Sequence, residues 1–244
     1  LFGVPIFFRG DNVIVPSSAE KVIIISPHNE QIRYEFRLGF STWHKENYGE
    51  DAQVVWSVPG GTSEIRRMLQ SQYTHAIETG KDPGGDADLV FGGGSYEHGV
   101  LKKPITSTWN GEEVTTTISV PATLDQHILD EVYGENVIGD IPIYDPEHYW
   151  HGLALSGFGI VYNNEVLETL DIDSPQGWEA LCNPELIGKL ALVNPAQSGS
   201  VTTAFEAILK NLGWKRGWQV LRRAAANARY FSASSLKPPA DVSQ

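Results

Sequence analysis

The N-terminal part of the chain alternates short apolar runs with amphipathic segments. Residues 21–25 form a β-branched run typical of a strand that is covered on both faces. Residues 30–48 carry apolar or aromatic side chains three or four positions apart, which is typical of an amphipathic helix. The same order recurs with a strand at 53–58 and a helix from residue 62, and a third unit begins at 87–91. Three such units predict an α/β domain with a mainly parallel sheet.

The start of the second predicted helix has its own signal. Thr62 is predicted as the N-cap, and Ser63 and Glu64 follow it in the first turn. A hydroxyl and a carboxylate are the groups that satisfy the free amides of a helix start. The turn 59–61 before it contains Pro-Gly-Gly.

The pattern changes after residue 104. Residues 106–122 are polar and rich in β-branched side chains, which we interpret as extended chain leaving the first domain at a boundary near residue 120. The α/β alternation then resumes, and this predicts a second lobe rather than a longer first sheet. The elements expected there are strands at 153–155, 159–162, 189–193 and 229–231 and helices at 175–182, 201–211 and 214–226.

The two ends of the chain differ from this pattern. Residues 1–20 begin with an apolar run and continue into a polar Pro/Ser-rich stretch. They are either a tether with the remnant of an export or anchor segment, or an ordinary buried strand or packed arm. Residues 236–244 are predicted to be a loop without a closing helix.

Composition narrows the class of protein. With 41% hydrophobic and 20% charged residues, the 244-residue chain is neither a disordered tail nor a fibre. The net charge is −12 and no stretch gathers enough cations to neutralise a run of phosphates, so a nucleic-acid partner is not expected. The single cysteine, Cys182, excludes an internal disulfide and a thiolate metal cluster, and its apolar neighbours predict a buried hydrophobe rather than a nucleophile.

Motifs for catalysis are absent from the sequence. It has no phosphate-binding P-loop, no nucleophile elbow and no complete dinucleotide fingerprint. Residues 92–94 come closest to the last of these, but Glu97 stands where its final glycine belongs. His148 and His151 are a weak metal signal, and we interpret them as structural or solvent-facing histidines.

Small-residue loops recur where predicted strands end. In an open α/β sheet, ligands bind at the carboxyl ends of strands, and free amides at a helix start attract anions. Any one loop is equally explained by turn and cap residues, but four of them favour a cleft that grips a small polar ligand. The loops are residues 26–29, 59–63, 92–96 and 194–200.

The order of these segments resembles a known family, the bacterial extracellular solute-binding proteins of ABC importers. It is similar to the branch that holds the ferric-ion, polyamine, thiamine and organophosphate binders. The resemblance implies an α/β, two-lobed, periplasmic-binding-protein-like fold, each lobe a mainly parallel sheet flanked by helices, that closes on its ligand. The segments that carry the resemblance are 22–29, 59–62, 87–94, 156–163, 175–181, 188–195 and 198–200.

The resemblance also implies how the chain is organised and where it works. Lobe 1 would take residues 21–120, lobe 2 residues 121–235, and 236–244 would begin a crossover back to lobe 1. Because members of this family are usually longer, lobe 1 is expected to be incomplete. The implied protein is a monomer without enzymatic activity or a cofactor, either periplasmic or membrane-anchored outside the cytoplasm, and its partners are a small-molecule ligand and an ABC permease.

Ligand-binding residues are assigned from the same resemblance. Neutral donors in the loops favour an anionic organic ligand such as a phosphate or carboxylate compound. Two alternatives remain, a ferric-ion binder of the same fold and an α/β enzyme that acts on a small phosphorylated substrate with His28 or Glu30 as base. In ferric-ion binders a first-loop histidine is a ligand, but here His28 is out of phase by one residue or Asn29 replaces it. No metal ligand is assigned. The expected ligand-binding residues are His28, Asn29, Gly61, Thr62, Ser95, Tyr96, Ser156, Ser198, Gly199 and Ser200.

Overall fold

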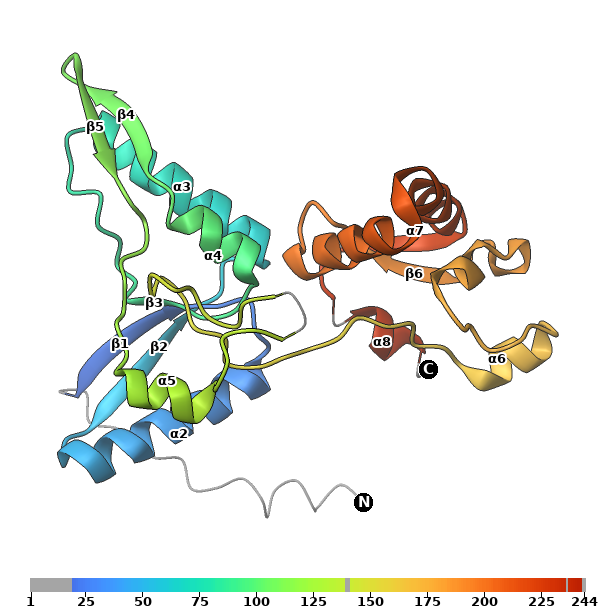
Figure 1. Cartoon of the computed structure of the whole chain (residues 1–244), viewed down its shortest axis with the longest axis horizontal. Helices are drawn as coiled ribbons and strands as arrows, with labels where there is room; N and C mark the ends of the chain where they lie inside the picture. Colours follow the sequence, from blue (N-terminus) through green and yellow to red (C-terminus); the bar gives the residue numbers. More distant parts are fainter. Residues whose placement is uncertain (1–18, 139–140, 236, 243–244) are drawn as a thin grey trace. The chain divides into compact units, whose positions relative to one another are not determined.

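The structure is a computed structural model that describes residues 19–138, 141–235 and 237–242. The chain divides into two compact units, Leu1–Gly60 with Gly85–Gly92 and Gly61–Gly84 with Gly93–Gln244. Both contain parallel strands flanked by helices, so the predicted α/β class is confirmed (Figure 1). The interpretation of residues 1–20 as a tether falls almost wholly outside the described residues.

The first unit is built around a three-stranded parallel sheet. Its strands are β1 (Glu20–Ile25), β2 (Ala52–Ser57) and β3 (Leu89–Val90), in the order β2-β1-β3. Helix α2 (Glu30–Tyr48) packs against β2, and the Ser41 hydroxyl on this helix donates a hydrogen bond of 2.9 Å to a β2 carbonyl. The β-branched run is buried only at its end: Ile24 and Ile25 are buried, whereas Val22 and Ile23 are half-buried.

The second unit begins with helices α3 (Thr62–Glu78) and α4 (Ser95–Leu101). The N-cap of α3 is Gly61, so the assignment of Thr62 as N-cap was wrong by one residue and Thr62 is the first helical residue. The two helices pack on each other.

The segment interpreted as an extended linker is a β-hairpin. Strands β4 (Ile105–Trp109) and β5 (Glu112–Thr116) pair antiparallel, and β4 lies against α3. The turn residues Asn110 and Gly111 have φ angles of 50° and 84°. An Asn-Gly pair adopts positive φ with little strain and is a strong hairpin signal, so the linker interpretation of this part of 106–122 was wrong.

The middle of the second unit has little regular structure. It contains α5 (Gln126–Val132), α6 (Asn164–Thr169) and two 3₁₀ helices, Trp178–Cys182 and Pro184–Leu186. Residues 152–163 form no strand, so the strands predicted at 153–155 and 159–162 were wrong, and the helix predicted at 175–182 is the shorter 3₁₀ turn. A strand requires a hydrogen-bonding neighbour, and an apolar run in the sequence does not supply one.

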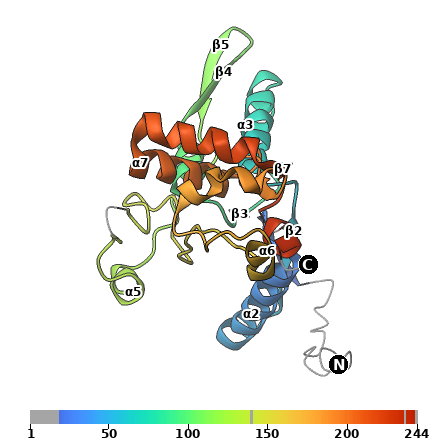
Figure 2. The same ribbon diagram turned by 90° about the vertical axis from the view of Figure 1, so that its right-hand side faces the viewer.

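The C-terminal part of this unit returns to α/β order. Strands β6 (Leu190–Val193) and β7 (Ala228–Ser232) pair in parallel, connected by α7 (Gly199–Ala226). Gly213, with φ 74° and ψ 160°, breaks α7 into two arms, which matches the two helices expected there. The arms lie side by side (Figure 2), because a side chain at Gly217 would meet the Leu209 Cα at 2.9 Å. Ile208, Val220 and Leu221 form the core between them.

A short helix follows β7. Helix α8 (Lys237–Val242) forms where a loop was expected, and two prolines stand in its first turn, where the missing N–H groups cost nothing. Asp241 accepts hydrogen bonds from Lys237, at 2.7 Å, and from Tyr230 on β7. These contacts fix α8 beside the small sheet.

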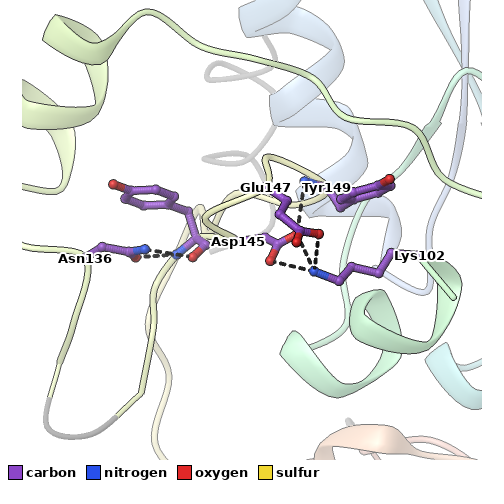
Figure 3. Close-up of polar contacts among 6 residues, drawn as sticks. Lys102, Asn136, Asp145, Glu147 and Tyr149 are labelled. Carbon is purple, nitrogen blue, oxygen red and sulfur yellow. Dashed lines mark hydrogen bonds and ion pairs between the residues drawn. The ribbon is translucent and has the colours of Figure 1, made fainter.

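An ion-pair cluster holds the irregular segment after α5 to the end of α4 (Figure 3). Lys102 Nζ lies 3.0 Å from the buried Asp145 carboxylate and 3.1 Å from Glu147. Asn136 Oδ1 accepts hydrogen bonds from the backbone amides of 143–144 at 3.1 and 2.9 Å. Every cation and anion of this cluster is paired, so its role is structural.

Candidate functional site

Three helices of the second unit begin close together. The Gly199 amide at the start of α7 donates a 3.2 Å hydrogen bond to Thr62 Oγ1 at the start of α3. Gly61 approaches the loop before α7 so closely that a Cβ on it would lie 2.3 Å from the Gln197 carbonyl oxygen. Arg67 on α3 also donates a 3.1 Å hydrogen bond to a carbonyl of this loop. We call Gly61, Thr62, Glu97, Ser198 and Gly199 the helix-start junction.

Glu97 contributes a buried carboxylate to the junction. It lies in the first turn of α4 and is only 5% exposed. A Cβ on Gly199 would lie 2.0 Å from Glu97 Oε1 and 2.6 Å from Thr62 Oγ1. Only glycine therefore fits at position 199 while Glu97 and Thr62 keep these positions.

The junction has the chemistry of an anion site. The first amides of a helix have no acceptor within the helix, and the aligned peptide dipoles place partial positive charge there. Ser198 is the N-cap of α7 and 8% exposed, yet its side chain caps no amide of that helix. Thr62 and Ser198 thus add hydroxyl groups to the amides at the starts of two long helices, which is the arrangement that binds anions in many proteins.

A cationic side chain lies one turn further along α3. The Arg66 guanidinium lies 5.9 Å from the centre of the Tyr96 ring on α4. Its Nε is buried and has no hydrogen-bond acceptor among the described residues. Arg66 therefore keeps an unused donor and a positive charge on the helix that starts the junction.

In the first unit, the polar side chains of the loop after β1 have partners within the protein. His28 Nδ1 shares a 2.9 Å hydrogen bond with Ser26 Oγ, and its ring packs 4.7 Å from that of Phe91. A Cβ on Gly92, where φ is 110°, would lie 2.6 Å from the His28 ring. Burial lowers the pKa of His28 below its usual value, although a hydrogen bond to the Phe91 backbone opposes this. The imidazole is accordingly neutral at pH 7.

Asn29 in the same loop has a local role. It is the N-cap of α2, and its Oδ1 accepts a 3.0 Å hydrogen bond from the Ile32 amide. Glu30, the other base considered for a catalytic alternative, is exposed. The side chains of His28 and Asn29 thus have protein partners, and their contact with a ligand stays a prediction.

The ten expected ligand residues fall into separate groups. Gly61, Thr62, Ser198 and Gly199 come together in the helix-start junction. The others remain predictions at their places in the chain: Ser95 and the 59%-exposed Tyr96 in the first turn of α4, Ser200 exposed in α7, Ser156 exposed within 152–163, and His28 and Asn29 in the first unit.

Glu97 was missed as a site residue. The sequence contained a signal for it, because Glu97 follows Gly94 at the same spacing as Glu64 follows Gly61. Such an acid is expected to cap its own helix. Its position against Gly199 depends on a segment distant in the sequence, which spacing alone cannot reveal.

The two histidines considered as a weak metal signal form a structural pair. His148 Nδ1 and His151 Nε2 share a hydrogen bond of 3.4 Å, and burial together with His148 lowers the pKa of His151. Throughout the described ranges, no three His, Cys, Asp or Glu side chains gather as metal ligands would. Cys182 packs against the α7 core and burial raises the pKa of its thiol, but the residue is half-buried rather than buried as predicted.

A helix that crosses a membrane must be long and apolar. Within residues 19–138, 141–235 and 237–242, no helix is long and apolar enough to cross a bilayer.

More than half of the chain matches a known protein family, and parts of it match individual proteins. Residues 107–240 match the family model described as bacterial extracellular solute-binding protein. The phosphoglycerate transport regulatory protein PgtC of Salmonella typhimurium is 29% identical over 84 residues, which are 34% of this chain and 21% of PgtC. An uncharacterized protein of Haemophilus influenzae is 24% identical over 184 residues, covering 72% of this chain and 46% of that protein. The chain therefore spans between about a fifth and a half of these relatives.

Two solved structures are similar in fold. The periplasmic binding protein AfuA from Actinobacillus pleuropneumoniae, with exogenous fructose-6-phosphate bound, matches with a TM-score of 0.57 and 16% identity over 92% of this chain and 60% of AfuA. The periplasmic binding protein P5PA matches with a TM-score of 0.50 and 19% identity over 89% of this chain and 59% of P5PA. At these identities the likeness concerns the fold.

Proposed function

Because the chain belongs to the bacterial extracellular solute-binding protein family, we propose that it captures a small phosphorylated organic anion outside the cytoplasm for import. Proteins of this family bind solutes and are not enzymes, so the alternative of a phosphate-processing enzyme is set aside. The observation that carries the ligand class is the helix-start junction, where the half-buried Thr62, the buried Ser198 and two glycines gather at the starts of α3 and α7.

The junction supports an anion on electrostatic grounds. The starts of α3 and α7 are in contact and both have partial positive charge, and the first-turn amides other than that of Gly199, which donates to Thr62, can donate to phosphate oxygens. Thr62 and Ser198 supply hydroxyl donors, and glycines at 61 and 199 remove the side chains that would keep a ligand from the backbone. Arg66 adds a full positive charge nearby.

Two similar proteins support phosphate as the anionic group. PgtC carries phosphoglycerate transport in its name, and AfuA was solved with fructose-6-phosphate bound. Both names concern molecules that contain a phosphate and hydroxyl groups. Since each match covers a part of the relative or rests on fold alone, these names support the ligand class without assigning one compound.

The wider arrangement belongs to the same proposal. We propose two lobes, 21–120 and 121–235, that close on the ligand, with 236–244 leading back toward the first lobe. These bounds differ from those of the two compact units, because contacts such as that of Thr62 with Gly199 group 61–84 and 93–120 with the second unit. The loaded protein would then deliver the solute to an ABC permease in the membrane. A monomer suffices for this role, and the proposal includes neither a nucleic acid nor a resident cofactor.

A ligand screen tests the proposal. Purified protein is melted with fructose 6-phosphate, 3-phosphoglycerate, inorganic phosphate, ferric citrate and uncharged fructose, and hits are titrated by calorimetry. We expect at least one organic phosphate to raise the melting temperature, because a ligand that binds only the native state stabilises it, and to be recovered unchanged. Binding of ferric citrate alone would favour the ferric-ion alternative, and turnover of a phosphate ester would contradict the proposal.

A further inference from the structure

The second arm of α7, residues 214–226, has a buried side and an exposed side. Val220 and Leu221 on the buried side belong to the core between the two arms. On the exposed side, Trp214 and Trp218 are 73% and 41% exposed. Their rings contact each other edge to face, with centroids 5.6 Å apart. The arm therefore presents two large aromatic side chains, next to each other, to solvent.

Cations lie on the same side of this arm. Residues three, four or seven positions apart share one face of a helix, so Lys215 and Arg222 adjoin the two tryptophans. Both residues are exposed, and neither forms an ion pair with another described residue. Arg216, on the other flank, is instead paired with Glu179 at 2.7 Å. The exposed side is from here on the tryptophan face, made of Trp214, Lys215, Trp218 and Arg222.

The charge around the tryptophan face is opposite to that of the whole chain. Residues 207–240 contain seven Lys or Arg and no Asp or Glu, whereas the net charge of the chain is −12. An acidic partner would be attracted to this region although the chain as a whole repels it. The tryptophan face thus fits a partner that is acidic, partly apolar and met in one orientation.

A bilayer with anionic headgroups has both of these properties. Tryptophan concentrates at the boundary between headgroups and hydrocarbon, because its ring has an apolar body and one N–H donor. Lysine and arginine side chains near such a surface are attracted to its phosphates, and their long stems let the charges reach the headgroups. Two unpaired cations are too few to neutralise a run of nucleic-acid phosphates, whereas individual lipids move laterally to meet them.

We propose that the tryptophan face binds the surface of a membrane that contains anionic lipids, with the indole rings at the headgroup boundary and Lys215 and Arg222 on lipid phosphates. This inference goes beyond the proposed function, because it concerns neither the solute nor the helix-start junction. Binding is expected to be reversible and weakened by salt, since two rings and two cations hold a protein far less firmly than a spanning helix does.

The test measures binding to vesicles in the absence of any solute. The protein is sedimented at low salt with vesicles of phosphatidylglycerol and phosphatidylcholine in equal parts, and with vesicles of phosphatidylcholine alone. We expect the wild type to bind the anionic vesicles, and the double variant Trp214→Ala/Arg222→Gln to bind them about tenfold more weakly, because it removes one ring and one charge.

A matched double variant controls for the loss of an exposed tryptophan and an exposed arginine as such. Trp43, which is 49% exposed, and Arg37 both lie on α2 in the first unit. Trp43→Ala/Arg37→Gln should therefore bind the anionic vesicles within about twofold of the wild type, since it removes the same groups outside the tryptophan face.

Three results would overturn the inference while the proposed capture of a solute stands. The first is a wild type that binds neither kind of vesicle or binds both equally. The second is binding that Trp214→Ala/Arg222→Gln retains, which places the contact elsewhere. The third is binding through this face to soluble polyglutamate but not to vesicles, which makes the partner an acidic protein. If the double variant does not fold, Trp214→Ala replaces it, and unchanged binding by this variant overturns the inference as well.

Discussion

The loop after β1 and the helix-start junction contain similar residue types and use them in different ways. In the loop, Ser26 and His28 share a hydrogen bond, and Asn29 caps α2. At the junction, the Ser198 side chain caps no amide of α7, and the buried Arg66 Nε one turn into α3 has no acceptor among the described residues. Polar groups that satisfy each other stabilise a fold, whereas buried groups left without partners are available to a ligand. This contrast is why we propose the junction, and not the loop, as the binding site.

The largest expected effect is that of a side chain at position 199. Gly199→Ala would place a Cβ 2.0 Å from Glu97 Oε1, so the Glu97 and Thr62 side chains must move away from α7, and we expect the free energy of unfolding to fall by about 1–3 kcal/mol. Gly39→Ala is the matched control, since no atom lies within 4 Å of its Cβ position in the middle of α2. The control should gain about 0.5–1 kcal/mol. Urea unfolding measures the free energy of unfolding of both variants. If Gly199→Ala raised it as Gly39→Ala does, the junction would not be closely packed.

The next effect concerns ligand affinity. Thr62→Ala and Ser198→Ala should each weaken fructose 6-phosphate binding by about 1–3 kcal/mol, because each removes a hydroxyl group from the proposed anion site. Thr79→Ala is the control at the other end of α3, where Oγ1 donates to the His75 carbonyl at 2.7 Å. Calorimetry measures the affinity of all three variants for fructose 6-phosphate. Unchanged affinity in both Thr62→Ala and Ser198→Ala would remove these residues from the site.

A smaller effect is expected in the first loop. Asn29→Ala removes the cap of α2 and should lower the free energy of unfolding by about 1 kcal/mol while affinity for fructose 6-phosphate stays the same. Urea unfolding and calorimetry measure the two quantities on one sample. A loss of affinity without a loss of stability would show that the loop binds the ligand, as the resemblance implied, and would end the distinction between the two regions.

The smallest expected effect is a pH dependence of stability. Burial lowers the pKa of His28 in the folded state, so below its ordinary value of 6.5 the unfolded chain binds more protons than the native one. Stability is therefore expected to fall as the pH drops from 7 through 6.5 toward the folded-state pKa. Chemical unfolding across this range should show a shallower fall for His28→Gln. An equal slope in both proteins would mean that His28 is not the group responsible.

The sequence predicted the elements whose signals are local. The strand and helix of the first unit followed from a β-branched run and an amphipathic period. The two helices predicted at 201–211 and 214–226 correspond to the arms of α7, which meet at Gly213. The hairpin at 105–116 also had a local signal, Asn110-Gly111, but its polar strands were interpreted as a linker.

Elements that depend on distant partners could not be predicted in this way. The runs 153–155 and 159–162 have strand-like composition, yet no neighbouring strand pairs with them in the structure described. For the site, glycine and hydroxyl residues marked the helix starts, but spacing could not show that Thr62 meets Gly199 or that Glu97 joins them. Contacts between distant segments decide which of several similar loops has unused groups.

The most direct test of the central claim locates the ligand on the protein. Amide chemical shifts of isotope-labelled protein are recorded while fructose 6-phosphate is added, because amides that donate to a phosphate group shift strongly. The largest shifts are expected at Thr62, Ser63 and residues 198–200, with little change at Asn29 and Ile32. Saturable binding whose largest shifts lie at the β1 loop, with none at the helix-start junction, would contradict the account.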